Sequence, residues 1–240
     1  MRKIRLFVNE KQLKPNLEIK IIDGDFNYLN KVMRQKLTDK IFVFNGYDGE
    51  FLAEIILMEK KFLIIKILEK TANLSQDLNL TLAFALIKNV ASDFIAKKGV
   101  EMGVKNFQPL ITKHTIVDKI NAEKFLANVK EGLEQCERND LANLREVKNL
   151  KSFLNEENEN RIFILCDESM RASKAGDVLS KINFQDKEIM LLVGPEGGFS
   201  EEELRLMYNK ENLFRISLGK RILKADTAII AALALVAEFV

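Results

Sequence analysis

Residues 191–204, LLVGPEGGFSEEEL, combine the residue types and spacing of a small-molecule site. An apolar run through Val193 predicts a buried strand, which stops in a glycine-rich loop at residues 194–199. Ser200 and Glu203, three residues apart, form the pattern of a capping box that opens a helix. Ligands of open α/β sheets bind at such strand ends. The segment therefore predicts a ligand site, although a plain turn before a well-capped helix explains it equally well.

The charge of this loop narrows the class of ligand. No Lys or Arg lies between Lys187 and Arg205, and four carboxylates crowd the loop and the helix start: Glu196, Glu201, Glu202 and Glu203. A phosphate cradle uses bare backbone N–H groups with a lysine nearby, so a nucleoside triphosphate is disfavoured. S-adenosylmethionine carries a sulfonium, an ammonium and a single carboxylate, which suits a site of this charge.

A second strand-loop-helix segment, RISLGKRILKADTAIIAALALV, lies near the C-terminus. In a parallel sheet both loops leave the same edge, so they can wall one pocket. We expect Ile222 and Leu223 to suit an adenine ring, and three cations to face a polyanion: Lys220, Arg221 and Lys224. The helix at residues 228–237 is apolar all round and predicts burial on every side, or a dimer contact.

Composition sets limits on the function. The 240 residues include 37 basic and 35 acidic side chains, so no global field attracts nucleic acid and any RNA contact must come from local patches. Two cysteines and the single His114, which we assign to a surface or loop, give no disulfide framework and no metal cluster. The N-terminus lacks the apolar region of a signal peptide, and the most apolar segment is shorter than the roughly 20 residues that span a bilayer. We expect a cytoplasmic protein without metal or membrane partner.

The pattern of apolar residues divides the chain into two parts. The first seventy residues predict a small β-barrel, with strands at residues 4–8, 18–22, 41–44, 50–58 and 61–68. A polar segment at residues 71–76 marks the boundary. Beyond it, strands and helices alternate, with strands at residues 80–85, 107–111, 161–166, 189–193 and 213–218. This alternation predicts an α/β fold with a mostly parallel sheet covered on both faces, and domains at residues 1–72 and 73–240.

Several of these segments resemble the RsmE-type 16S ribosomal RNA uridine methyltransferases, members of the SPOUT class. VGPEGGFSEEEL is similar to the family's GPEGG loop, and LGKRILKADTAIIAALA to its LGxRILRxETA segment. KGVEMGV at residues 98–104 and EGLEQCER at residues 131–138 are similar to its KxxELGV and EAxEQSxR. IRLFV and KVMRQKLTD resemble motifs of its PUA-like barrel. The chain departs mildly from these motifs: it has Lys224 where the family has Arg, Asp226 where it has Glu, Cys136 where it has Ser, and Thr38 where it has Gly. Because Lys cannot make the two parallel hydrogen bonds of Arg, a bidentate contact at position 224 is less well supported.

The resemblance implies a PUA-like, RNA-binding β-barrel followed by a SPOUT domain with a deep trefoil knot, acting as a homodimer. The implied reaction transfers the methyl of S-adenosylmethionine to N3 of a uridine in 16S rRNA of the small ribosomal subunit. Arg221 either favours the uridine anion or clamps a phosphate, and Glu196 either accepts the proton or holds loop backbone. The implied cofactor residues are Leu192, Gly194, Gly197, Gly198, Leu218, Gly219, Ile222 and Leu223. The implied RNA contacts are Arg5, Arg34, Lys220 and Lys224.

Three other functions compete with this one. A related SPOUT enzyme could methylate a tRNA base or a ribose 2′-hydroxyl, although the N-terminal barrel and the LGKRILKADTA segment argue against it. A non-catalytic RNA-binding module would not need the glycines of both loops, and a metabolite-binding α/β protein would not explain the barrel.

Overall fold

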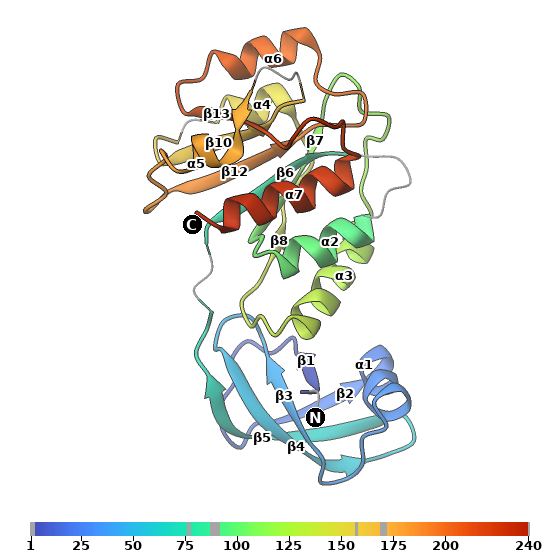
Figure 1. Ribbon diagram of the computed structural model, residues 1–240. Helices are drawn as coiled ribbons and strands as arrows, with labels where there is room; N and C mark the ends of the chain where they lie inside the picture. Colours follow the sequence, from blue (N-terminus) through green and yellow to red (C-terminus); the bar gives the residue numbers. More distant parts are fainter. Residues whose placement is uncertain (1–2, 76–77, 87–91, 157, 169–171, 240) are drawn as a thin grey trace. The chain divides into compact units, whose positions relative to one another are not determined.

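The computed structural model describes residues 3–75, 78–86, 92–156, 158–168 and 172–239 (Figure 1). The chain forms two compact units. The first holds Met1–Gln76 together with Leu133–Leu141, and the second holds Asp77–Gly132 and Ala142–Val240. The first unit thus includes a stretch of the chain that lies well beyond the boundary expected from the polar segment at residues 71–76.

The first unit is a curled sheet in the order β1-β3-β4-β5-β2. Its strands are β1 (Arg5–Phe7), β2 (Glu18–Ile22), β3 (Lys40–Phe44), β4 (Glu50–Met58) and β5 (Phe62–Ala72). β1 pairs with β3 in parallel and the other pairs are antiparallel. All five predicted strands are confirmed, whereas α1 (Asp23–Asn27) and the π-helical turn η1 (Tyr28–Val32) were not predicted.

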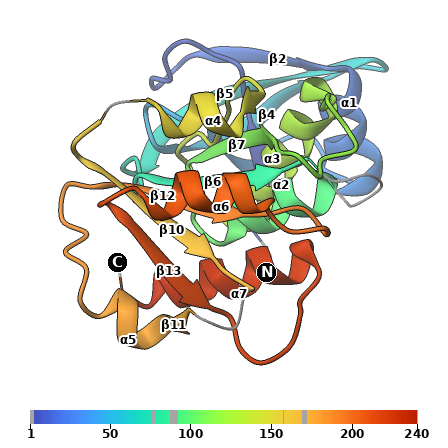
Figure 2. The ribbon, with the colours of Figure 1, turned by 90° about the horizontal axis from the view of Figure 1, so that it is seen from above.

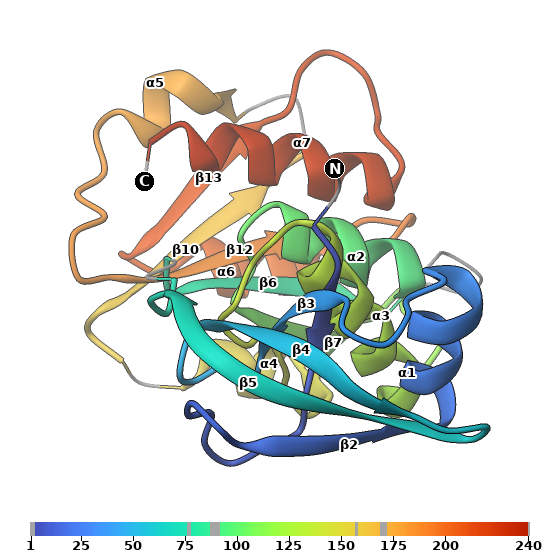
Figure 3. The same ribbon diagram turned by 90° about the horizontal axis from the view of Figure 1, so that it is seen from below.

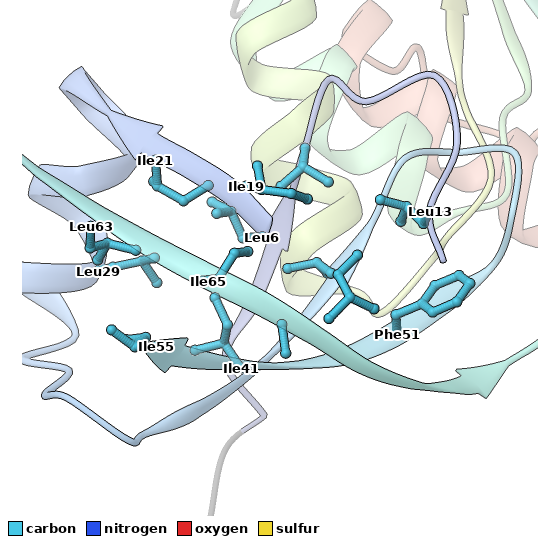
Figure 4. Close-up of a cluster of buried hydrophobic side chains, with 14 of the residues drawn as sticks. Leu6, Leu13, Ile19, Ile21, Leu29, Ile41, Phe51, Ile55, Leu63 and Ile65 are labelled. Carbon is cyan, nitrogen blue, oxygen red and sulfur yellow. The ribbon is translucent and has the colours of Figure 1, made fainter. Parts of the chain in front are cut away.

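Alternating side chains build the core of this unit. In β2, Ile19 and Ile21 are buried while their neighbours are exposed, as the two-residue period of a strand requires. Figure 4 shows these side chains pointing toward those of the facing strands and toward Leu29 of η1. The core therefore needs the helical turns after β2 as a cover.

The second unit is a parallel sheet in the order β11-β13-β10-β12-β6-β7-β8, with β9 also paired to β7. Its strands are β6 (Leu80–Ala85), β7 (Asn106–Ile111), β8 (Asn143–Leu144), β9 (Lys148–Asn149), β10 (Arg161–Cys166), β11 (Ser173–Lys174), β12 (Glu188–Val193) and β13 (Leu213–Ser217). β6 and β12 are buried along their whole length, as expected for central strands covered on both faces.

Helices cover both faces of this sheet. Figure 2 shows α4 (Leu150–Leu154) and α6 (Glu201–Tyr208) over one face, and Figure 3 shows α2 (Ser92–Glu101) beside α7 (Ala225–Ala237) on the other. The remaining helices are α3 (Ala122–Gln135) and α5 (Ala175–Leu179). Residues 173 and 174, directly before α5, pair with β13 as the short strand β11.

Helix α7 is not buried on every side in this chain. Ala225, Ile229, Ala232, Leu233 and Val236 form its buried face. Thr227, Ala234 and Ala237 are exposed on the other side. The expectation of burial all round is therefore wrong for the single chain. No helix within the described ranges is long and apolar enough to cross a membrane.

Candidate functional site

The carboxyl ends of β10, β12 and β13 surround a cavity of about 240 Å³ in the second unit. Both predicted loops contribute to its wall, together with residues 166–168 and the start of α7. The predicted site residues that line it are Gly194, Glu196, Gly198, Leu218, Gly219, Arg221, Ile222 and Leu223. The prediction that two loops of one sheet edge wall a single pocket is confirmed.

A tight turn shapes the first of these loops, residues 194–199. The N–H of Gly198 donates to the carbonyl of Pro195 over 2.9 Å, and Gly198 has a φ of +66°, a conformation that L side chains rarely adopt. A Cβ there would stand 2.2 Å from Oε1 of Glu168. At Gly194 a Cβ would stand 2.9 Å from the Phe199 ring. The glycines thus let Glu168 and Phe199 pack directly on the main chain.

The start of α6 holds the far end of this loop. The Ser200 side chain accepts from the N–H of Glu203, and the N–H of Ser200 donates to Glu203 Oε2 over 2.8 Å. The predicted capping box is confirmed. It satisfies two N–H groups that a helix start leaves open, so the loop enters the helix in a defined direction.

The second loop, residues 218–224, is less tightly held. Gly219 has a φ of +119°, and its N–H donates to Ser217 Oγ over 3.3 Å. Ile222 is 83% exposed, while Leu223 is half-buried. Ile222 therefore borders the cavity with most of its side chain exposed.

Among the described residues, three charged side chains on the wall have no hydrogen-bond or ion-pair partner: Glu168, Glu196 and Arg221. Glu196 makes no hydrogen bond to loop backbone there, so that alternative loses its support. Lys220 and Lys224 are exposed beside the cavity. Asp226, in contrast, accepts from the N–H of Thr227 over 2.6 Å at the start of α7.

Residues 166–168, the last residue of β10 and the two that follow it, were not predicted as part of the site. Asp167 is buried, and its Oδ2 accepts from Tyr208 over 2.9 Å and from Arg215 Nε over 2.7 Å. The Arg215 guanidinium lies 4.1 Å from the centre of the Tyr208 ring. Burial raises the pKa of the Cys166 thiol to about 12, so it stays protonated at neutral pH. Charged residues directly after a buried strand were the available signal.

Two predicted cofactor residues do not line the cavity. Leu192 is fully buried in the core under α4 and α6, in contact with the cluster that contains Phe163 and Met190. Strand alternation places its side chain inside, so the expectation that it packs on a ligand is wrong. Gly197 lies against His114, whose Cβ would be 3.3 Å from a Cβ on this glycine.

His114, expected on a surface or loop, is exposed and contacts the first loop. Its Nδ1 lies 3.0 Å from the carbonyl oxygens of both Gly197 and Gly198. The neighbouring N–H of Lys113 donates to Glu203 Oε1 over 2.7 Å. The segment after β7 thus supports the loop and the helix start that follows it.

Of the two RNA contacts expected in the first unit, one is exposed and the other is buried. Arg34 is exposed. Arg5 has a side chain 0% exposed, and its Nε donates to Glu50 Oε2 over 2.7 Å. Its other nitrogens donate to the carbonyls of Leu133 and Arg138 over 2.6 and 2.9 Å. Since the whole guanidinium is used inside the unit, the expectation that Arg5 contacts RNA is wrong.

Glu50 is the acidic partner of this internal arginine. Burial alone would raise the pKa of Glu50, but hydrogen bonds from Lys3, Arg5 and Thr71 hold it below its ordinary value. The pair stays ionised and binds residues 133–138 to the sheet. The described ranges hold no group of three His, Cys, Asp or Glu side chains placed to bind a metal.

Comparisons with known proteins give the family. Residues 74–237 match the model of an RNA methyltransferase domain, and residues 21–68 match that of an RNA methyltransferase PUA domain. The chain is 31% identical to the ribosomal RNA small subunit methyltransferase E of Rickettsia conorii, over 98% of this chain and 95% of that protein.

Two solved structures are similar over almost the whole chain. One is a ribosomal RNA small subunit methyltransferase E from Neisseria gonorrhoeae bound to S-adenosyl methionine (TM-score 0.84, 28% identity, 97% of this chain and 96% of that chain). The other is a methyltransferase from Legionella pneumophila in complex with the same cofactor (TM-score 0.84, 29% identity, 98% and 97%). The predicted fold class is confirmed, and the chain belongs to the ribosomal RNA small subunit methyltransferase E family.

Proposed function

We propose that this protein transfers the methyl group of S-adenosylmethionine to N3 of a uridine in 16S rRNA. The observation that carries the proposal is the single cavity that the GPEGG and LGKRIL loops wall together. Relatives with the same fold bind this cofactor, and a relative over the full length is a ribosomal RNA small subunit methyltransferase.

The residues present fit the cofactor. Main-chain groups of Gly194, Gly198, Leu218 and Gly219 border the cavity, and Leu223 offers an apolar surface beside them. The wall has two unpaired carboxylates and one guanidinium among the described residues. A ligand with a net positive charge suits this wall, and a triphosphate does not. When bound, the cofactor supplies an electrophilic methyl on its sulfonium.

The chain must then manage a proton at N3, because the neutral imide nitrogen has no available lone pair. Arg221 favours the uridine anion through its positive charge. Glu196, exposed on the same wall, accepts the proton. Positioning of the nitrogen behind the methyl contributes the rest of the acceleration.

RNA meets the protein on basic side chains that position the substrate more than they specify it. Lys220 and Lys224 lie beside the cavity, and Arg34 is exposed on the first unit. We assign residues 1–72 to an RNA-binding PUA-like domain and residues 73–240 to the methyltransferase domain.

The open face of α7 suits a second copy of the chain. Its exposed and half-buried residues are small or apolar, among them Ile230, Ala231, Ala234 and Leu235. Burial of this face in a homodimer would complete the core that the helix lacks in one chain. The proposed rRNA substrate supports a cytoplasmic location for the enzyme.

The test uses small ribosomal subunits from cells that lack the gene. Purified enzyme with S-adenosylmethionine should create one new reverse-transcription stop in 16S rRNA, since N3 methylation blocks base pairing. The same reaction with S-adenosylhomocysteine as the only ligand serves as control. A methyl found on tRNA, or on a ribose 2′-hydroxyl, which leaves base pairing intact, would overturn the assignment. The homodimer is measured separately by the mass in solution.

A further inference from the structure

The only histidine of the chain lies on the cofactor loop although it comes from a distant segment. His114 Nδ1 is 3.0 Å from the carbonyl oxygens of Gly197 and of Gly198, which are 83 and 84 residues away in sequence. A carbonyl oxygen only accepts hydrogen bonds. The ring therefore carries a proton on Nδ1 and shares it between the two carbonyls.

The turn that presents this histidine is itself fixed. Thr115 Oγ1 accepts from the N–H of Thr112 over 2.9 Å, and the two threonine hydroxyls lie 2.8 Å apart. The N–H of Thr115 donates to the carbonyl of Thr112 over 3.2 Å. These bonds close a short turn directly after β7, so His114 leaves it in a defined direction.

A second bond joins the same turn to the other end of the loop. The N–H of Lys113 donates to Glu203 Oε1, while Oε2 of the same carboxylate completes the capping box with Ser200. Residues 113 and 114 thus hold the loop at Gly197 and Gly198 and again at Glu203. Gly198, one of these points, borders the cavity.

We infer that His114 is a positioning residue for the cofactor loop, acting through the Gly197 and Gly198 carbonyls from an imidazole protonated at Nδ1. This role rests on the proposed function, because the loop is taken to bind S-adenosylmethionine through its main chain. With the carbonyls held by His114, the Gly197–Gly198 peptide keeps the orientation in which the Gly198 N–H donates to the Pro195 carbonyl, so the loop keeps its shape where Gly198 borders the cavity.

Three variants of His114 test whether the position of the hydrogen-bond donor matters, or only the presence of a side chain. Asn keeps a donor two bonds from Cβ, where Nδ1 stands, whereas Gln moves it one bond further, where Nε2 stands. We expect His114→Asn to bind S-adenosylhomocysteine within twofold of the wild type. His114→Gln and His114→Ala should bind it roughly fivefold to tenfold more weakly, the loss of one hydrogen bond. In His114→Gln and His114→Ala the KM for S-adenosylmethionine should rise by a similar factor, while kcat changes less.

The tautomer offers a readout that needs no variant and no ligand. Free neutral imidazole prefers its proton on Nε2, so an Nδ1–H ring is a signature of the bonds to the loop. Nitrogen NMR of the full chain at a pH above 8 has a single histidine to observe. We expect Nδ1 to carry the proton.

Two results would overturn the inference: a ring protonated at Nε2, or a His114→Asn variant that loses as much affinity as His114→Ala. Thermal unfolding of each variant accompanies the binding measurement, so that a misfolded protein is recognised and the NMR result decides instead. If the wild type binds neither S-adenosylmethionine nor S-adenosylhomocysteine, the proposed function fails, while the tautomer still reports on the histidine.

Discussion

Residues 194–199 and residues 218–224 wall the same cavity, yet their surroundings differ. The first loop is held by His114, by the capping box and by the Phe199 ring against Gly194. The second is held near Ser217 and then runs through exposed residues to Ile222. A loop fixed in advance loses little conformational entropy when it binds a small ligand through its main chain. A loop whose cations stay unpaired is suited to a substrate that arrives later.

The largest expected effect concerns the chemistry of the second loop, residues 218–224, which we call the open loop. Arg221→Ala should lower kcat for methylation of small subunits by roughly a hundredfold, with binding of S-adenosylhomocysteine within about threefold of the wild type. The loss follows from removal of the positive charge that favours the uridine anion. Rates at saturating RNA measure it.

Arg221→Lys is the matched control, since it keeps the positive charge and loses the planar guanidinium that can make two parallel hydrogen bonds. If kcat is unchanged in Arg221→Ala and only the KM for RNA and its salt dependence change, Arg221 is a phosphate clamp. The open loop would then position RNA without taking part in the chemistry.

The next effect tests whether the first loop is fixed. Gly198→Ala should weaken binding of S-adenosylhomocysteine by about tenfold or more, because alanine is strained at a φ of +66° by roughly 1–2 kcal/mol and its Cβ displaces Glu168. Calorimetric titration measures the affinity.

Gly103→Ala is the control for backbone strain alone. Gly103 has a φ of +84° with open space around it, on the turn after α2 and away from the cavity. Its substitution should lower the free energy of unfolding by about 1–2 kcal/mol and leave the affinity unchanged. Equal affinities in both variants would mean that the shape of the first loop is not required.

A smaller effect distinguishes cofactor from product. Glu168→Gln should weaken binding of S-adenosylmethionine by about threefold and that of S-adenosylhomocysteine by less, because only the former carries a sulfonium charge. Comparison of the two affinities at low and high salt measures the electrostatic part. A larger loss for S-adenosylhomocysteine, which lacks the sulfonium, would show that Glu168 acts through shape.

The smallest effect concerns the tip of the open loop. Ile222→Ala should change the affinity for S-adenosylhomocysteine by less than about twofold, since the side chain is 83% exposed. The free energy of unfolding should change by less than about 0.5 kcal/mol. Leu223→Ala, which removes a half-buried side chain from the same wall, serves as comparison. A loss above fivefold for Ile222→Ala would mean that the open loop folds over the ligand.

The sequence predicts what depends on neighbours along the chain. The strands at residues 80–85 and 161–166, the helix at residues 201–208 and its capping box all follow from local periodicity and spacing. The shared edge of both loops follows from the parallel sheet.

What the sequence does not predict depends on partners far away in the chain. Arg5 looks like a surface cation until Glu50 and the carbonyls of residues 133 and 138 are placed around it. Leu192 looks like a pocket residue until the sheet face of the cavity is known. His114 gives no signal at all, because its acceptors are main-chain atoms of another segment.

Cys166 places a thiol on the wall of the cavity, and burial raises the pKa of that thiol to about 12. A thiolate is a strong nucleophile toward a sulfonium methyl, and Cys166 lines the cavity proposed to bind S-adenosylmethionine. With a pKa of about 12, only about one thiol in 100,000 is ionised at neutral pH. A protonated thiol is a weaker nucleophile than a thiolate, so the raised pKa disfavours attack of this sulfur on a sulfonium methyl.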